Sequence, residues 1–242
     1  MSLICEPRRE GETAREYAYS MLRENIANLN LEPGCTLNDT NIAAQLGISR
    51  TPVREAINQL KGESEIIEIY PQRGMKVALI DINIIRNVRL MRMVLEKEMI
   101  RRCCDIACEE DILWMEENVA LQHFYHRQKK MQQAVEVDNQ LHRKFYELAG
   151  FDYVYRSTRG PMIHYDRVRV LESFYDTYLD SIRDHSSMIC AVRERNPAEA
   201  CRLMEQHLDR WLVNERRLRA EYPHYFKKEG MGHEGSQNYA AG

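Results

Sequence analysis

Hydrophobic residues recur at three- and four-residue steps along most of the chain, and this spacing predicts amphipathic helices. The first helix is expected within residues 11–30 and ends at a Pro-Gly turn. Two shorter helices follow between residues 38 and 60. The turn between them contains Gly47, a residue type that readily takes a positive φ, and Ser49 is placed to cap the second helix. The pattern therefore predicts a helix-turn-helix.

Two short runs rich in β-branched residues come next, at residues 66–70 and 75–80, with a turn between them. They predict a β-hairpin, so the first 80 residues are expected to form a winged helix-turn-helix of three helices plus a hairpin wing. Arg73 and Gly74 lie at the wing tip, where glycine lets the backbone approach a DNA groove closely. The side chains left facing outward at the start of the second short helix suit phosphates and guanine edges, and they are Ser49, Arg50, Thr51 and Arg54.

From residue 81 onward the chain has no further strand pattern, only long amphipathic segments. Helices are predicted at residues 82–107, 109–128, 131–149, 152–159, 163–194 and 197–222. Pro161 is expected to break the chain between the fourth and fifth, and the fifth is either one kinked helix or two. The fold class is thus mainly α, with an all-α bundle of six or seven helices over residues 81–228. Residues 229–242 are polar and glycine-rich, and we expect them to be disordered.

Composition indicates the compartment of the protein and how it would bind DNA. The 242 residues contain neither an apolar run of ~18 residues nor a signal pattern, so we expect a cytoplasmic protein without membrane contact. Seven cysteines at irregular spacings fit a reducing compartment. The net charge is −3, and residues 1–80 carry nine Lys and Arg against eleven Asp and Glu. DNA binding would therefore depend on a local basic face rather than on total charge.

Four residues of the predicted bundle form a candidate metal site. Asp138 and His142 lie four residues apart and so project from one helix face. His185 and His207 each lie within the apolar stripe of a later helix. One carboxylate and three imidazoles that converge inside a bundle would bind a divalent metal with open coordination positions. The alternative is that these are hydrogen-bonded core histidines, and spacing alone leaves both interpretations open.

Two motifs of the N-terminal part resemble those of a known family. Leu46-Gly-Ile-Ser-Arg-Thr-Pro-Val-Arg-Glu-Ala-Ile57, followed by Ile69-Tyr-Pro-Gln-Arg-Gly74, is similar to the DNA-binding domain of the GntR family of bacterial transcription regulators. The resemblance implies that the outward-facing residues of the recognition helix and of the wing tip contact DNA, and that Thr40 contacts the phosphate backbone. The sequence departs from the family at Glu65, where a glycine is expected.

The C-terminal part resembles the FCD domain, the ligand-sensing half of FadR-type GntR regulators. The similarity lies in Arg92-Met-Val-Leu-Glu96, Asp138-Asn-Gln-Leu-His142, Asp184-His185 and Met204-Glu-Gln-His-Leu208. It implies that Asp138, His142, His185 and His207 bind a divalent metal (Zn, Ni, Mn or Fe), which helps to hold a small carboxylate effector. It also implies that Arg92 faces the effector cavity.

The sequence therefore predicts a regulator, not an enzyme: a homodimer that binds a double-stranded DNA operator under the control of a small carboxylate. Two alternatives stay open. One is a metalloenzyme that uses the Asp/His₃ site, and the other is a DNA-binding protein whose bundle serves only dimerisation.

Overall fold

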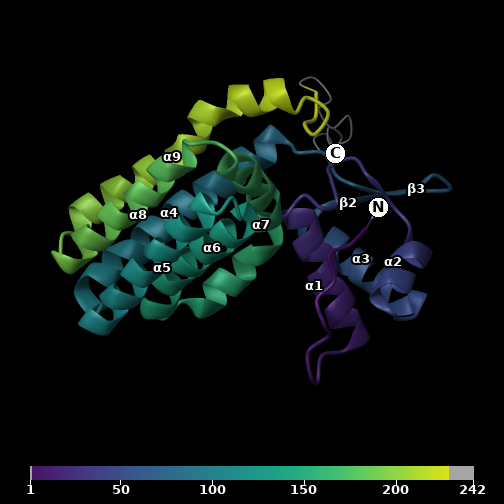
Figure 1. Cartoon of the computed structure of the whole chain (residues 1–242), viewed down its shortest axis with the longest axis horizontal. Helices are drawn as coiled ribbons and strands as arrows, with labels where there is room; N and C mark the ends of the chain where they lie inside the picture. Colours follow the sequence, from purple (N-terminus) through teal and green to yellow (C-terminus); the bar gives the residue numbers. More distant parts are fainter. Residues whose placement is uncertain (1, 229–242) are drawn as a thin grey trace, which may run out of the picture.

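The structure, a computed structural model, describes residues 2–228, and this part of the chain contains nine helices and one small sheet. Figure 1 shows two lobes, one formed by α1–α3 with the sheet and the other by α4–α9. The predicted winged helix-turn-helix followed by an all-helical bundle is confirmed. Within the described residues, no helix is long and apolar enough to cross a membrane.

The first lobe is a winged helix with a three-stranded sheet. Its elements are α1 (Ala14–Ala27), β1 (Thr36–Leu37), α2 (Asp39–Leu46), α3 (Arg50–Ser64), β2 (Ile67–Tyr70) and β3 (Gly74–Val77). The strand order is β1-β3-β2 and both pairings are antiparallel. Gly47 takes the left-handed conformation with a φ of 66°, and Ser49 caps α3 with extended backbone, as the sequence predicted. The prediction missed β1, because two residues carry no readable alternation.

The second lobe is a bundle of six helices in the described residues. They are α4 (Ile82–Ile106), α5 (Glu109–Arg127), α6 (Met131–Leu148), α7 (Asp152–Ser173), α8 (Tyr178–Arg193) and α9 (Pro197–Glu221). One predicted boundary is wrong, because α7 continues through Pro161 and the chain breaks after Ser173 instead. The predicted disordered tail, residues 229–242, lies outside the described residues.

Tertiary packing explains why α7 survives its internal proline. A proline inside a helix removes one hydrogen bond and costs about 3 kcal/mol. Here α7 lies against the end of α3, so closely that a Cβ on Gly160 would come within 2.9 Å of the Glu63 carbonyl oxygen. Met162 and Ile163 are buried directly after the proline. This burial offsets the lost hydrogen bond, a contribution that a local rule about proline cannot include.

Helix α7 also joins the two lobes (Figure 1). Ile163 packs into the core of the winged helix. The His164 Nε2 atom lies 2.5 Å from the Ser64 carbonyl oxygen, and Arg167 Nη1 donates to the Ala78 carbonyl at 2.6 Å. The backbone N–H of Ile80, between the lobes, donates to the Tyr225 carbonyl at 2.8 Å. The winged helix is thus packed on the bundle, largely through α7.

Candidate functional site

The predicted DNA-contacting residues lie on the outer end of the winged helix. Ser49, Arg50, Thr51 and Arg54 are exposed around the first turn of α3. Ser49 caps α3 by its backbone only, since its side chain makes no capping hydrogen bond. These hydroxyl and guanidinium groups therefore face the solvent, as contacts to a major groove require.

The wing and α2 complete this face. Arg73 and Gly74 are exposed at the turn between β2 and β3, and Gly74 has a φ of 94°, which favours glycine. Thr40 is exposed on α2. Arg54 and Gly74 border one open groove of about 420 Å³ between α2, α3 and β3. The structure therefore brings one predicted residue of the recognition helix and one of the wing to the same groove.

Glu65 takes the conformation that a glycine would take. It ends α3 with a φ of 55°. A left-handed conformation costs a non-glycine residue about 1–2 kcal/mol. The Glu65 side chain is exposed, so its carboxylate is not forced into the protein. The departure from the family pattern thus leaves the backbone turn intact and costs some stability.

Three of the four predicted metal ligands converge in the bundle, from α6, α8 and α9. His142, His185 and His207 are buried, and each offers a nitrogen within 4.8 Å of the other two. The ring centroids of His185 and His207 are 4.5 Å apart, and their Nε2 atoms are 3.4 Å apart. The lone pairs of two ring nitrogens at this distance repel one another unless a proton or a cation lies between them.

The Nδ1 atom of His185 has a hydrogen-bond acceptor, and carboxylates lie beside the Nδ1 atoms of the other two rings. The Nδ1 atom of His185 is 2.8 Å from the Gln122 amide oxygen, and that of His142 is 2.7 Å from a Glu96 carboxylate oxygen. His207 Nδ1 lies 3.8 Å from Asp184. An acceptor at Nδ1 favours a ring whose Nε2 lone pair is available, which is the usual arrangement around protein metal sites.

In the described part of the chain, the ring nitrogens of His142 lack hydrogen bonds, which fits the role of a metal ligand. Its Nε2 atom is 3.2 Å from Asp138, yet neither ring nitrogen has the geometry of a hydrogen bond. A buried polar atom without a hydrogen bond costs about 1–3 kcal/mol. Coordination of a cation would satisfy this nitrogen, so the residues present fit a metal better than they fit a conventional core.

Charges in the cluster are also those that a divalent cation requires. Burial lowers the pKa of His185 to about 3 and that of His207 well below its ordinary value, so both rings stay neutral at physiological pH. Burial alone would raise the pKa of Asp138, but the guanidinium of Arg169 holds it well below the usual range. The cluster thus offers two neutral imidazoles, those of His185 and His207, and an ionised carboxylate.

Asp138 is within reach of the cluster but is shared with other groups. Its Oδ1 atom lies 3.8 Å from His185 Nε2 and only 2.6 Å from Arg169 Nη2. The Tyr178 hydroxyl donates to Oδ2 at 3.2 Å. Asp138 could act as a fourth ligand only by dividing its charge between the metal and Arg169.

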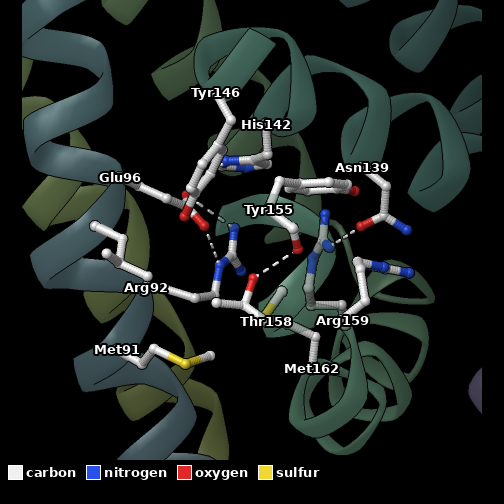
Figure 2. Close-up of a pocket in the computed structure, with 12 residues that line it drawn as sticks. Met91, Arg92, Glu96, Asn139, His142, Tyr146, Tyr155, Thr158, Arg159 and Met162 are labelled. Carbon is white, nitrogen blue, oxygen red and sulfur yellow. Dashed lines mark hydrogen bonds and ion pairs between the residues drawn. The ribbon is translucent and has the colours of Figure 1, made fainter. Parts of the chain in front are cut away.

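A small pocket lies beside the cluster, between α4, α6 and α7, and Figure 2 shows the side chains that line it. Arg92, the predicted effector-binding residue, lines this pocket together with Arg159 and Arg169. The Arg92 guanidinium is already paired, because its Nε donates to Glu96 at 2.7 Å, and its Cζ lies 5.1 Å from the Tyr165 ring centroid. The cavity measures about 10 Å³, room for about one water molecule.

Several residues that shape the site were missed by the sequence analysis, namely Glu96, Gln122 and Arg169. Glu96 stands four residues after Arg92, a spacing that also describes an ordinary surface ion pair. Both side chains are nearly fully buried here, with exposed fractions of 2% and 3%. Only the tertiary fold distinguishes a buried ion pair of the site from an ordinary surface ion pair.

Matches to two family models cover about three quarters of the chain. Residues 14–77 match the gntR family of bacterial regulatory proteins, and residues 88–210 match the FCD domain. The chain is 26% identical over 219 residues to the HTH-type transcriptional repressor RspR of Escherichia coli, which covers 90% of this chain and 96% of that protein. An uncharacterised HTH-type regulator of Streptomyces ambofaciens is 25% identical over 218 residues, or 89% of this chain and 91% of that protein.

Solved structures share the fold at lower identity. E. coli McbR/YncC superposes with a TM-score of 0.75 at 16% identity, covering 87% of this chain and 99% of that one. A GntR regulator from Rhodococcus sp. RHA1 gives a TM-score of 0.70 at 18% identity, covering 83% and 96%. These likenesses show the fold.

Proposed function

The chain belongs to the gntR family of bacterial DNA-binding transcription regulators and carries its FCD domain, and from this premise we propose that a small carboxylate, held beside a divalent metal in the bundle, sets its affinity for operator DNA. The family and its relatives are regulators, so the metalloenzyme alternative has no support. The observation that carries the proposal is the convergence of three buried histidines beside a pocket lined by three arginines.

Asp138, His142, His185 and His207 would hold the metal. Imidazole and carboxylate donors suit Zn, Ni, Mn and Fe alike. When bound, the ion would supply a positive centre with open positions for a carboxylate oxygen. The protein's own contribution is the position of the rings: Gln122 accepts from Nδ1 of His185 and so leaves its Nε2 lone pair for the ion, and Glu96 lies beside Nδ1 of His142.

A carboxylate effector must compete with carboxylates of the protein. Arg92 is paired with Glu96 and Arg169 with Asp138, and the pocket holds about one water. An effector that pairs with either guanidinium therefore replaces an internal ion pair, and side chains of the pocket must move to admit it. Arg–carboxylate pairs can be bidentate, which gives the site directional selectivity for a carboxylate.

A chain of charged side chains supports coupling between this site and the winged helix. Arg169 contacts Asp138 at 2.6 Å and Asp166 at 3.7 Å, and Asp166 lies 3.5 Å from Arg23 of α1. A metal or effector that draws Asp138 or Arg169 toward itself changes the contacts of Asp166. The effector then controls DNA binding if the two arrangements of this chain differ in their affinity for it.

DNA binding itself is assigned to the surface described above. Ser49, Arg50, Thr51 and Arg54 would contact bases and phosphates from α3, Arg73 and Gly74 from the wing, and Thr40 the backbone. A homodimer would place two recognition helices in successive major grooves. We assign residues 1–80 to the DNA-binding domain and 81–228 to the effector and dimerisation domain, in a protein that acts in the cytoplasm, where bacterial DNA lies.

Elemental analysis of the full-length protein tests the metal site. Wild type should carry a stoichiometric divalent metal, and His142→Ala and His207→Ala should lose it. His123→Ala, which changes a histidine of α5 outside the cluster, is the matched control and should keep it. Full metal occupancy in both cluster variants would refute the ligand set.

A DNA-binding titration tests the effector. We would enrich a duplex from a random library with the full-length chain and titrate the complex with sugar acids, hydroxy acids, dicarboxylates and fatty acids. At least one class should shift the DNA affinity of wild type by fivefold or more, the lower end of ordinary allosteric coupling. No shift across the panel would favour a purely structural bundle.

A further inference from the structure

Both arginines of the recognition helix are bound to one carboxylate of the neighbouring helix. Arg54 Nε donates to Asp39 Oδ2 at 2.5 Å, and Arg50 Nη2 donates to the two Asp39 oxygens at 3.1 and 3.3 Å. Asp39 stands in the first turn of α2 and borders the groove between α3 and the wing. We propose that Asp39 is a specificity-determining residue, which holds these arginines in position for base edges and withholds them from phosphates.

The geometry leaves the reading edge of Arg54 open. Asp39 engages its Nε, and in residues 2–228 neither terminal nitrogen of Arg54 has a hydrogen-bond partner. An arginine reads guanine by donating two hydrogen bonds to O6 and N7. The two terminal nitrogens can do so while Nε stays on Asp39. The ion pair can therefore persist in a complex with the correct sequence.

A phosphate contact sets a different requirement. To follow the irregular positions of phosphates on arbitrary DNA, a guanidinium must swing away from its place over the groove. Arg50 and Arg54 are 51% and 59% exposed and could do this freely, whereas Asp39 is only 13% exposed and fixed on α2. Phosphate binding thus requires the ion pairs to break, whereas Arg54 can bind guanine with its ion pair intact. Arg50 already uses a terminal nitrogen for Asp39, so this part of the argument concerns Arg54. The difference favours the specific complex.

The acidic balance of the winged-helix lobe increases the effect of Asp39 on the preference for the specific complex. Residues 1–80 carry nine basic against eleven acidic side chains, so few cations compete for phosphates. If Asp39 withholds two of these cations, Arg50 and Arg54, the non-specific attraction of the lobe to DNA phosphates is weak. This inference rests on the DNA-contact roles proposed above for Arg50 and Arg54.

The test compares Asp39→Asn with wild type in the full-length protein. Asn keeps the size of the side chain and a hydrogen-bond acceptor but removes the charge. Affinity would be measured by fluorescence anisotropy over a series of KCl concentrations, on poly(dI-dC) and on the duplex enriched by the wild-type chain. Glu55→Gln removes one negative charge from exposed α3 without releasing either arginine, and so controls for net charge.

For Asp39→Asn we expect affinity for poly(dI-dC) to rise by about tenfold, because two freed arginines neutralise two more phosphates per winged helix. The slope of log affinity against log salt should steepen by about 1.8 for each winged helix. Affinity for the enriched duplex should rise less, so the ratio of specific to non-specific affinity falls. A merely structural role of Asp39 would lower both affinities instead.

The inference fails if Asp39→Asn behaves as Glu55→Gln does, or if the affinity ratio stays unchanged. Arg54→Ala separates this failure from failure of the assigned contacts. If Arg54→Ala and Arg50→Ala leave affinity for the enriched duplex unchanged, the contact roles themselves are wrong. If they weaken binding while Asp39→Asn does not alter the ratio, only the role of Asp39 is wrong. Melting temperatures of all variants show whether each is folded.

Discussion

Asp166 links the bundle to the winged helix, and its replacement gives a demanding test of the interface. Its Oδ2 atom lies 3.5 Å from Arg23 and 3.4 Å from Arg159, and its Oδ1 atom lies 3.7 Å from Arg169. The Asp166 side chain is 4% exposed. Asp166→Asn therefore leaves three guanidinium groups around a neutral side chain in a poorly hydrated place.

The expected cost follows from this burial. Removal of one partner from a buried ion pair costs about 3–5 kcal/mol, since the other charge stays buried without its partner. The contacts are long and Arg23 and Arg159 are 15% and 25% exposed, so we expect the lower end, about 3 kcal/mol. For a chain of this length the melting temperature should fall by about 6–12 °C.

A matched control is Asp180→Asn. Asp180 pairs with Arg183 at 2.6 Å, but the two side chains are 40% and 71% exposed. An exposed pair contributes at most about 1 kcal/mol. Calorimetry of both variants beside wild type makes the comparison. If Asp166→Asn melts within about 2 °C of Asp180→Asn, the network does not hold the lobes together, and the charge chain to α1 loses its energetic basis.

The same variant tests coupling. At a temperature where both proteins are folded, a carboxylate that shifts the DNA affinity of wild type should shift that of Asp166→Asn less. An equal shift would mean that the effector acts through another route, such as the apolar contacts of Ile163 with the winged-helix core.

Three further predictions concern single residues. Glu65→Gly should stabilise the protein by about 1 kcal/mol in thermal unfolding, because glycine adopts the observed φ without strain, and a loss of stability would contradict this. Burial, reinforced by Arg167, lowers the pKa of His164 from 6.5 to about 4, so its contribution is full above about pH 6.5 and is lost as the pH falls toward 4. The melting temperature of wild type should therefore decline more steeply over that range than that of His164→Gln, and parallel curves would refute the assignment. Arg50→Ala should weaken binding to the enriched duplex by about 1–3 kcal/mol, and unchanged retardation on gels would exclude the contact.

The winged helix could be predicted because its signals are local. Gly47 at the turn and Ser49 at the helix start each specify a backbone conformation by their own chemistry. Asn196 and Pro197 mark the start of α9 in the same way. Pro161 carries an equally strong local signal and gave the wrong boundary, because the packing of α7 on α3 comes from residues about 100 positions earlier.

The candidate metal site was predictable only in part, for a related reason. His142, His185 and His207 stand in apolar stripes, and a stripe indicates which face of a helix is buried. It does not indicate which buried faces meet. The partners Gln122 and Arg169 lie on α5 and α7, and nothing in their local sequence connects them with the histidines. Their roles follow from helix packing alone.

A common principle connects the two ends of the molecule. Arg54 in the groove is held by Asp39, and Arg92 in the pocket is held by Glu96. In both places the free protein already supplies the carboxylate partner that guanidinium groups favour. Binding of a phosphate or a carboxylate is then an exchange of ion pairs, whose net gain is small unless the incoming group also fits the geometry. If Arg54 and Arg92 have the roles proposed above, such exchange would reconcile recognition by arginines with a chain of net charge −3, and Asp39 and Glu96 would maintain selectivity rather than affinity.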